Sequence, residues 1–253
     1  HGLSIDLLVH PVVPVRRDAD WDLIDLPEGD GKGEKRESMI YIESDRIDAR
    51  SRRKLEELLF ATVADVRAAV ADWADMRAAL LRDADHLADA EGAALLRWLG
   101  EDMLTQVGHV TRYRNDERKD CFGICRSNGN RLISDSAFKC AFDWFEGRAG
   151  KPGRAPLIIK SNNLSRVHRR VPLDLFIVPV FEDGELAALS VHAGLWTSAA
   201  LTTPPGEVPL LRQQLTEIMG RFGINPDSHD HKTLIHAMSV LPHDLVIGFG
   251  ADD

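Results

Sequence analysis

The longest periodic signal in the chain lies between residues 48 and 88, where neither Gly nor Pro occurs. Apolar residues recur there at spacings of three and four, as they do on one face of an α-helix. These residues are Leu55, Leu59, Val63, Val66, Val70, Trp73, Met76 and Leu80. We expect one amphipathic helix, or two joined at a kink that the pattern does not place. The repeat is close to a heptad, so a partner helix could cover it, although packing on the domain's own core is favoured.

Two apolar stretches in the second half of the chain, residues 171–181 and 186–197, predict strands. Asp183-Gly184 lies between them and supplies the positive φ angles of a tight hairpin turn, so these strands should pair antiparallel. Shorter apolar or alternating stretches predict further strands at residues 3–15, 38–45, 107–113, 121–126 and 157–160. Residues 3–15 open the chain without an evident pairing partner, so we expect the chain to be part of a longer protein.

Further helices are predicted at residues 93–104, 136–148, 208–222 and 229–241. Gly223 should end the third of these, and Asp227 or Ser228 can cap the fourth. Strands that follow one another over short links, with helices segregated from them, are typical of an α+β fold. The sequence therefore predicts an antiparallel sheet with one long amphipathic helix and flanking helices.

Composition and charge exclude several classes of protein. The 253 residues are 44% hydrophobic and 28% charged, as in ordinary soluble domains, and the formal net charge is −9. A net negative charge repels nucleic acid and anionic membranes, and no apolar run approaches the ~18 residues of a membrane helix. We therefore expect neither a nucleic-acid nor a membrane partner. Three cysteines and no signal peptide indicate reduced thiols and a cytoplasmic location.

Histidines gather near the end of the chain, at His229, His231, His236 and His243. A metal site would need three or four ligands at fixed distances, and the spacing of these residues favours a plain surface helix instead. Cys121 and Cys125 would share a strand face, but they lack the spacing of zinc or redox motifs and are interpreted as buried thiols. We therefore predict no metal site.

One basic concentration precedes the predicted hairpin, and it comprises Lys160, Arg166, His168, Arg169 and Arg170. Because arginine offers bidentate donors, this group could bind a carboxylate effector or an acidic partner surface. The alternative is a solvated or interdomain salt-bridge cluster. No Ser-His-Asp signature, Gly-x-Ser-x-Gly motif or nucleotide fingerprint is present, so we predict no catalytic and no cofactor-binding residue.

Several short segments, taken in order, resemble the regulatory region that precedes the catalytic part of the large bacterial NAD-specific glutamate dehydrogenases. The segments are Val9-His10-Pro11-Val12, Ser38-Met39-Ile40-Tyr41-Ile42-Glu43, Leu96-Arg97-Trp98-Leu99, Lys160-Ser161-Asn162 with Val167-His168-Arg169, Gly194-Leu195-Trp196-Thr197-Ser198-Ala199, Pro209-Leu210-Leu211-Arg212, Ser228-His229-Asp230 and Leu241-Pro242-His243-Asp244. The match is sharpest from Gly194 to Ala199. In that family the long polypeptide carries ACT-type domains, a PAS-like domain and helical segments.

The resemblance implies a domain organisation. Residues 1–26 would be the C-terminal tail of a first ACT-type domain, and residues 27–37, rich in Gly and charge, a flexible linker. Residues 38–90 would hold a strand and the long helix, and residues 91–222 a PAS-like α+β domain. Residues 223–253 would be a helical lead to the next module.

The resemblance also implies a function. The family oxidises L-glutamate to 2-oxoglutarate and ammonia with NAD, and we expect this chain to regulate or assemble such an enzyme without catalysing the reaction. Its partners would be the rest of the parent chain, further copies of itself and a small-molecule effector, while NAD would bind elsewhere in the parent enzyme. Two alternatives remain: a free-standing PAS-like sensor or interaction module, and a metal-dependent hydrolase built on the late histidines.

Overall fold

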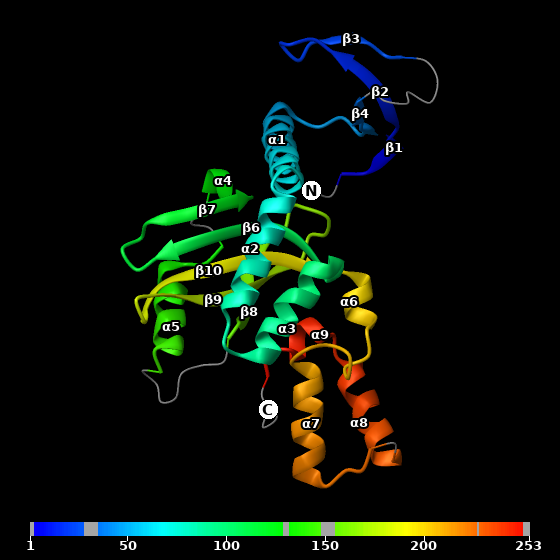
Figure 1. The fold of residues 1–253 in the computed structure, drawn as a ribbon. Helices are drawn as coiled ribbons and strands as arrows, with labels where there is room; N and C mark the ends of the chain where they lie inside the picture. The colour runs from blue at the N-terminus through cyan, green and yellow to red at the C-terminus, as the bar shows by residue number, and fades with distance from the viewer. Residues whose placement is uncertain (1–2, 28–34, 129–131, 148–154, 227, 250–253) are drawn as a thin grey trace. The chain divides into compact units, whose positions relative to one another are not determined.

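A computed structural model describes residues 3–27, 35–128, 132–147, 155–226 and 228–249. The chain divides into two compact units, residues 1–58 and 59–253. The described parts combine helices with antiparallel sheets, which confirms the predicted α+β class (Figure 1). None of the described helices is long and apolar enough to span a bilayer.

Short strands form the first unit. A two-stranded sheet joins β1 (Ile5–Val9) to β5 (Tyr41–Ser44), and a three-stranded sheet has the order β3-β2-β4. The strands of the second sheet are β2 (Val12–Arg17), β3 (Leu23–Asp25) and β4 (Lys35–Ser38). The expectation of one unpaired strand over 3–15 was therefore wrong: two separate strands flank Pro11, which has no N–H to give a ladder, and each pairs with later residues.

The predicted linker, residues 27–37, falls largely outside the described residues. Its end, from Lys35, belongs to β4, which pairs antiparallel with β2. The Arg17 guanidinium donates to both carboxylate oxygens of Glu37 at 2.8 Å, and Lys35 Nζ lies 3.9 Å from the centre of the Trp21 ring. These contacts hold the end of the segment in extended structure. The other domain limits predicted from the sequence stay predictions.

The second unit is built on a five-stranded antiparallel sheet of order β7-β6-β10-β9-β8. Numbered within this unit, the order is 2-1-5-4-3, so the central strand, β10, is the last strand along the chain. The strands are β6 (Leu104–Tyr113), β7 (Arg118–Gly123), β8 (Leu157–Leu164), β9 (Pro172–Glu182) and β10 (Glu185–Trp196). The predicted hairpin between β9 and β10 is confirmed, because Asp183 and Gly184 have φ of 51° and 86°.

The long helical signal between residues 48 and 88 is two helices, α1 (Ala49–Ala71) and α2 (Trp73–His86). The kink that the pattern did not place is at Asp72, with φ −100° and ψ 8°. The amphipathic stripe changes its environment there. Met76 in α2 is fully buried against the sheet unit, whereas Val70 in α1 is 73% exposed.

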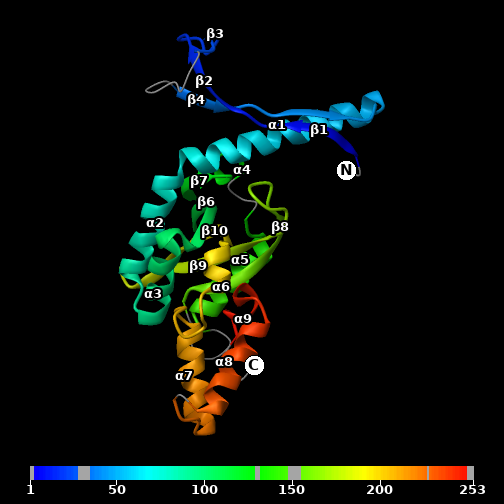
Figure 2. The same ribbon diagram turned by 90° about the vertical axis from the view of Figure 1, so that its right-hand side faces the viewer.

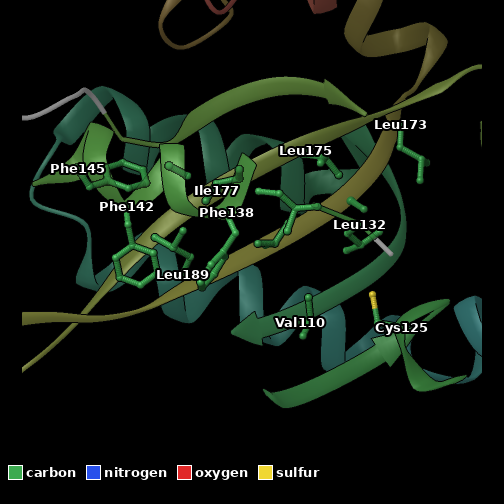
Figure 3. Close-up of a cluster of buried hydrophobic side chains, with 14 of the residues drawn as sticks. Val110, Cys125, Leu132, Phe138, Phe142, Phe145, Leu173, Leu175, Ile177 and Leu189 are labelled. Carbon is green, nitrogen blue, oxygen red and sulfur yellow. The ribbon is translucent and has the colours of Figure 1, made fainter. Parts of the chain in front are cut away.

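Helices cover both faces of the sheet. On one face, α5 (Asp135–Phe145) packs its phenylalanines against β9 and β10, as Figure 3 shows for Phe138, Phe142 and Phe145 beside Ile177. On the other face lie α2, α3 (Ala90–Trp98) and the turn Leu99–Met103 that follows α3. Their side chains surround Phe176 and Trp196, so the central strands are buried on both sides, as their unbroken apolar sequences require.

The end of the chain is helical, with α6 (Ser198–Thr202), α7 (Leu211–Phe222), α8 (His229–Val240) and α9 (His243–Val246). The predicted caps of the two longer helices are confirmed: Gly223 ends α7 with φ 64°, and the Ser228 hydroxyl accepts a hydrogen bond from the His231 N–H. Helices α7 and α8 lie side by side in both ribbon views (Figures 1 and 2). The short helices α6 and α9 were not expected.

Cys121 and Cys125 do not share a strand face, because β7 ends at Gly123 and Cys125 begins the short helix α4 (Cys125–Asn128). Gly123 turns the chain with φ 61°. Cys125 is buried as expected, and burial raises the pKa of its thiol to about 12, so this sulfur stays protonated. Cys121 is only partly buried, and Cys140 is exposed.

Candidate functional site

The basic residues predicted as a contact site are brought together only in part. Lys160 Nζ lies 2.6 Å from Asp174 Oδ1 and also contacts the Asp244 carboxylate of α9. The Arg169 guanidinium donates to the Trp196 carbonyl oxygen at 2.5 Å, at the end of β10. Lys160 and Arg169 therefore both act near Asp174, at the edge where β8, β9 and α9 meet.

The other three residues of the basic segment point elsewhere. Arg166 donates to Asp65 of α1 at 3.2 Å, within the second unit. His168 and Arg170 are exposed, and His168 has a left-handed backbone with φ 65°. The five residues thus do not converge on one anion, and three of them already hold partners within the chain.

Asp174 is the unusual group of this edge, because it is almost fully buried. Burial raises its pKa to about 6 and the Asp244 carboxylate adds to the rise, while Lys160 and Arg169 oppose it. Lys160 in turn has a raised pKa: burial opposes its charge, but the two aspartates outweigh this effect. No sequence pattern indicates this pairing, since residues 160, 174 and 244 are distant along the chain.

A second polar cluster lies inside the sheet unit, where the sequence predicted no site. His109 of β6 and His192 of the central strand β10 are directly paired in register, with ring centroids 4.5 Å apart. Ser190, two residues before His192, projects from the same face of β10. Asp83 reaches this face from α2. Both histidines and Ser190 are buried, and the Asp83 side chain is 17% exposed.

The four side chains form one hydrogen-bond network. His192 Nε2 lies 2.6 Å from Asp83 Oδ2, and His109 Nε2 lies 2.9 Å from Ser190 Oγ. Ser190 Oγ also contacts the same Asp83 oxygen. The other ring nitrogen of His109 lies 2.9 Å from the carbonyl oxygen of Asp120. A carbonyl oxygen only accepts, so His109 Nδ1 carries a hydrogen.

Burial sets the charges of this cluster. Loss of solvent, followed by the influence of His192, lowers the pKa of His109 to about 3, so its ring is neutral at physiological pH. Burial also opposes the charge of Asp83, but hydrogen bonds and charge from His192 outweigh it and lower the pKa of this carboxyl. The cluster therefore combines an ionised carboxylate with neutral imidazole.

Serine, histidine and aspartate are the residue types of a hydrolytic triad, but Ser190, His192 and Asp83 cannot act as a catalytic triad. Ser190 is 1% exposed and His192 is 0% exposed, so no substrate carbonyl can reach the Ser190 oxygen. Asp83 is the one partly exposed member of the cluster. The three histidine and aspartate ligand atoms lie within 4.8 Å of one another, and they are the only such group found among the described residues.

Sequence reasoning missed this cluster although a signal for it exists. Ser190 and His192 are polar residues at alternate positions within the apolar strand 186–197, which places both on one buried face. A buried histidine in such a strand requires partners, and these come from residues 83 and 109. Of the late histidines, His229 and His236 are exposed in α8, as predicted for a surface helix, whereas His243 is buried in α9 near the Ala200 carbonyl oxygen.

Comparison with known proteins relates the chain to one enzyme family. Residues 1–59 match the family model of the glutamate dehydrogenase ACT1 domain, and residues 208–247 match that of glutamate dehydrogenase helical motif 1. NAD-specific glutamate dehydrogenase from Pseudomonas aeruginosa is 28% identical over 269 aligned positions, and that from Halomonas elongata is 27% identical over 271. Each alignment covers 96% of this chain.

The chain spans only 16% of the length of each of these relatives. The ACT1 match extends the predicted ACT-type segment beyond residue 26, to include strands β4 and β5. The helical-motif match covers α7, α8 and α9. Leu211 of α7 and Ile247, which follows α9, are buried in the same core cluster as Phe176 of the sheet. The resemblance to the large NAD-specific glutamate dehydrogenases is thereby confirmed, and it includes the ACT1 domain of that family.

Proposed function

We propose that the chain is a non-catalytic regulatory and oligomerisation segment of a large NAD-specific glutamate dehydrogenase. The parent would convert L-glutamate, NAD and water to 2-oxoglutarate, ammonia and NADH, with NAD bound outside this chain and the enzyme in the cytoplasm. The proposal is carried by one observation, the presence of an ACT1 match and a helical-motif match in a single chain. The burial of Ser190 and both clustered histidines, which denies them a substrate, supports the same conclusion.

A role in assembly is supported by the surface of helix α1. Four apolar residues of this helix are exposed at spacings of four, three and four: Leu59, Val63, Val66 and Val70. That spacing is the a and d pattern with which two helices pack against each other. Contiguous exposed apolar side chains are typical of protein contact sites. The occupant that we propose is the same helix of a second copy of this chain.

For the basic segment we propose interdomain contact in preference to effector binding. Lys160 joins β8 of the sheet to Asp244 of α9, within the helical-motif match. Arg166 joins the segment to Asp65 of α1, and Arg169 joins it to the end of β10. Each link uses a donor that a free carboxylate effector would need.

The alternative of a small-molecule sensor is less well supported. Such a sensor would need a space between the sheet and its covering helix, whereas Phe138, Phe142 and Leu175 meet there with Ile177 and Leu189 (Figure 3). A thermal-shift screen with amino acids, 2-oxo acids and nucleotides tests for an effector directly. A ligand at 100 times its dissociation constant should stabilise the native state by about 2.7 kcal/mol.

Two measurements test the proposed function. The purified chain, supplied with glutamate and NAD, should produce no NADH above a protein-free blank, and turnover by the chain would refute the non-catalytic assignment. Sedimentation or light scattering over a range of concentrations should show self-association. Val70→Glu should shift this equilibrium toward the monomer, because it buries a charge in the proposed contact. Ala64→Glu, at an exposed position outside the stripe, is the matched control and should leave association unchanged.

A further inference from the structure

We propose that Asp83, His109 and His192 bind one divalent transition-metal ion of the zinc class between helix α2 and the centre of the sheet. The three residues come from α2, β6 and β10, and their ligand atoms lie within 4.8 Å of one another. The site goes beyond the proposed regulatory function and does not depend on it.

The first observation is an imbalance in the hydrogen bonds of the cluster. The His109 Nδ1–H donates to the Asp120 carbonyl oxygen, so Nε2 of the neutral ring presents a lone pair to Ser190 Oγ. Asp83 Oδ2, an acceptor, contacts the same hydroxyl. One hydroxyl proton therefore faces two acceptors. A cation among these atoms would satisfy both lone pairs at once.

The second observation concerns how the ring of His192 is held. Nδ1 of His192 is buried and has no hydrogen-bond partner within the described residues, although the residue is 0% exposed. The ring is tied to its surroundings through Nε2 alone, the nitrogen that faces Asp83 and Ser190, so Nε2 is the atom that would bind the metal. The ion would not account for Nδ1, because a ring bound through Nε2 carries its hydrogen on Nδ1.

The donor set selects the kind of ion. Two imidazole nitrogens and one carboxylate oxygen are the three protein ligands of zinc sites in which a water or substrate takes the fourth position. Here the Ser190 hydroxyl or a water would fill that position. Bonds of about 2.0–2.2 Å place two ligands of a tetrahedral ion about 3.3 Å apart. The 2.6 Å separation of His192 Nε2 and Asp83 Oδ2 would have to widen by less than about 1 Å.

The surroundings support the ligands. The hydrogen bond from His109 to the Asp120 carbonyl oxygen fixes the orientation of its ring, as outer partners of metal-bound histidines commonly do. The ring of Phe122 stacks on His109 with centroids 5.8 Å apart and excludes water from that side. Asp83 is the partly exposed ligand and gives the route of entry. A bound ion would tie α2 to strands β6 and β10 of the sheet.

Equilibrium dialysis against Zn²⁺ tests the site, with the chain first stripped by a chelator and the bound metal measured by mass spectrometry. One zinc per chain is expected. His192→Gln, His109→Gln and Asp83→Asn should each weaken binding by more than about tenfold, since even the loss of an outer partner of a metal ligand costs about 10–100-fold. Co²⁺ should give the visible absorption of a tetrahedral site when bound to the unsubstituted chain, and this absorption should be absent in each variant.

The controls are the other histidines. His243→Gln alters a buried histidine outside the cluster, and the double change His229→Gln with His231→Gln removes the late pair. Both variants should bind zinc as the parent chain does. Circular dichroism identifies a ligand variant that does not fold. In that event the unsubstituted chain provides the test: Zn²⁺ must raise its unfolding temperature, and Co²⁺ must give the tetrahedral spectrum. Zinc bound equally well by the folded ligand variants, or lost only with the late histidines, would overturn the proposal, as would a parent chain that binds none.

Discussion

Asp72, the buried residue at the break between α1 and α2, accepts hydrogen bonds from the guanidinium of Arg126, 54 residues later in the chain. The same carboxylate accepts a 2.8 Å bond from the backbone N–H of Gly123. Burial opposes the charge of Asp72, but these donors outweigh it and lower its pKa. The kink of the long helix is therefore held to the turn after β7.

Replacement of Asp72 by alanine should destabilise the chain by about 1–3 kcal/mol, because the buried Gly123 N–H would lose its acceptor. Arg126 can turn to water, since its side chain is 58% exposed, so its loss adds little. Urea unfolding followed by circular dichroism measures the change. Asp75→Ala is the control: it removes an exposed carboxylate from the same helix and should change stability by less than about 0.5 kcal/mol. Equal losses for the two variants would show that the contact is unimportant.

Two glycines with left-handed backbones should respond differently to alanine. Gly123 has φ 61°, and a Cβ there would lie 2.3 Å from the Val107 carbonyl oxygen, so the backbone would have to move. Gly184 has φ 86° in the β9–β10 turn, and a Cβ there meets nothing within 4 Å. We expect Gly184→Ala to cost about 1 kcal/mol from the left-handed backbone alone. Gly123→Ala should cost at least about twice as much or prevent folding. Thermal unfolding of both variants tests this order.

Local signals predicted several of the longer elements and their ends, although not the short helices α6 and α9. The helix between residues 48 and 88, the Asp183-Gly184 turn, the end of α7 at Gly223 and the Ser228 cap each depend on neighbours within a few residues. The sequence pattern of residues 48–88 allowed two interpretations, packing on the domain's own core and packing against a partner helix. Met76 and Leu80 of the stripe are buried in α2, whereas Val70 before the kink at Asp72 and Trp73 directly after it are exposed.

Long-range pairings could not be predicted in the same way. The strand interpreted as unpaired, residues 3–15, finds its partners beyond residue 34. The polar cluster joins residue 83 to residues 109 and 192, and nothing in a single sequence states which strands lie side by side. The sequence indicated Lys160 because it lies in a basic segment. In the structure its partners are Asp174 and Asp244, and the burial that makes Asp174 unusual is not visible in the periodicity of the sequence.

Asp174 should make stability fall as pH rises from about 4 to 6. Its folded pKa of about 6 lies above the ordinary value of 3.8, so the native state holds a proton that the unfolded state has released. Its stabilising contribution is complete below pH 3.8 and is lost through about pH 6. A tenfold difference in proton affinity corresponds to about 1.4 kcal/mol, so the stability lost over this range is at most about 3 kcal/mol.

The Asp174→Asn variant isolates this contribution. Asparagine does not titrate, so the difference in unfolding free energy between parent and variant should shrink steadily between about pH 4 and 6. Any effect of the substitution that does not titrate over this range adds a constant offset, so the slope with pH carries the information. Urea titrations at several pH values supply both curves. Asp183→Asn, in the exposed turn of the neighbouring hairpin, should leave the slope of the parent unchanged. A constant difference between parent and Asp174→Asn would contradict the raised pKa.

Glu91 should anchor the start of the helical motif to the sheet unit. Its carboxylate accepts two bonds from the Arg212 guanidinium, at 2.8 and 2.9 Å, and a longer one from the N–H of Leu210. Leu210 has φ 66°, a strained value for a branched residue, so this contact helps to hold an unfavourable backbone. The Arg212 hydrogen bonds lower the pKa of Glu91. Because the Arg212 side chain is 43% exposed, we assign the pair no more than about 1 kcal/mol.

Hydrogen exchange measures this anchor where it acts. In Glu91→Ala the amides of α7 should exchange about fivefold faster, the factor that about 1 kcal/mol produces if α7 opens as a local unit. The strands β9 and β10 should be unaffected, since their ladder lies away from the contact. Glu207→Ala removes an exposed carboxylate just before α7 and should leave its exchange unchanged. Equal acceleration in the two variants, or acceleration spread over the sheet, would mean that Glu91 does not anchor the helix locally.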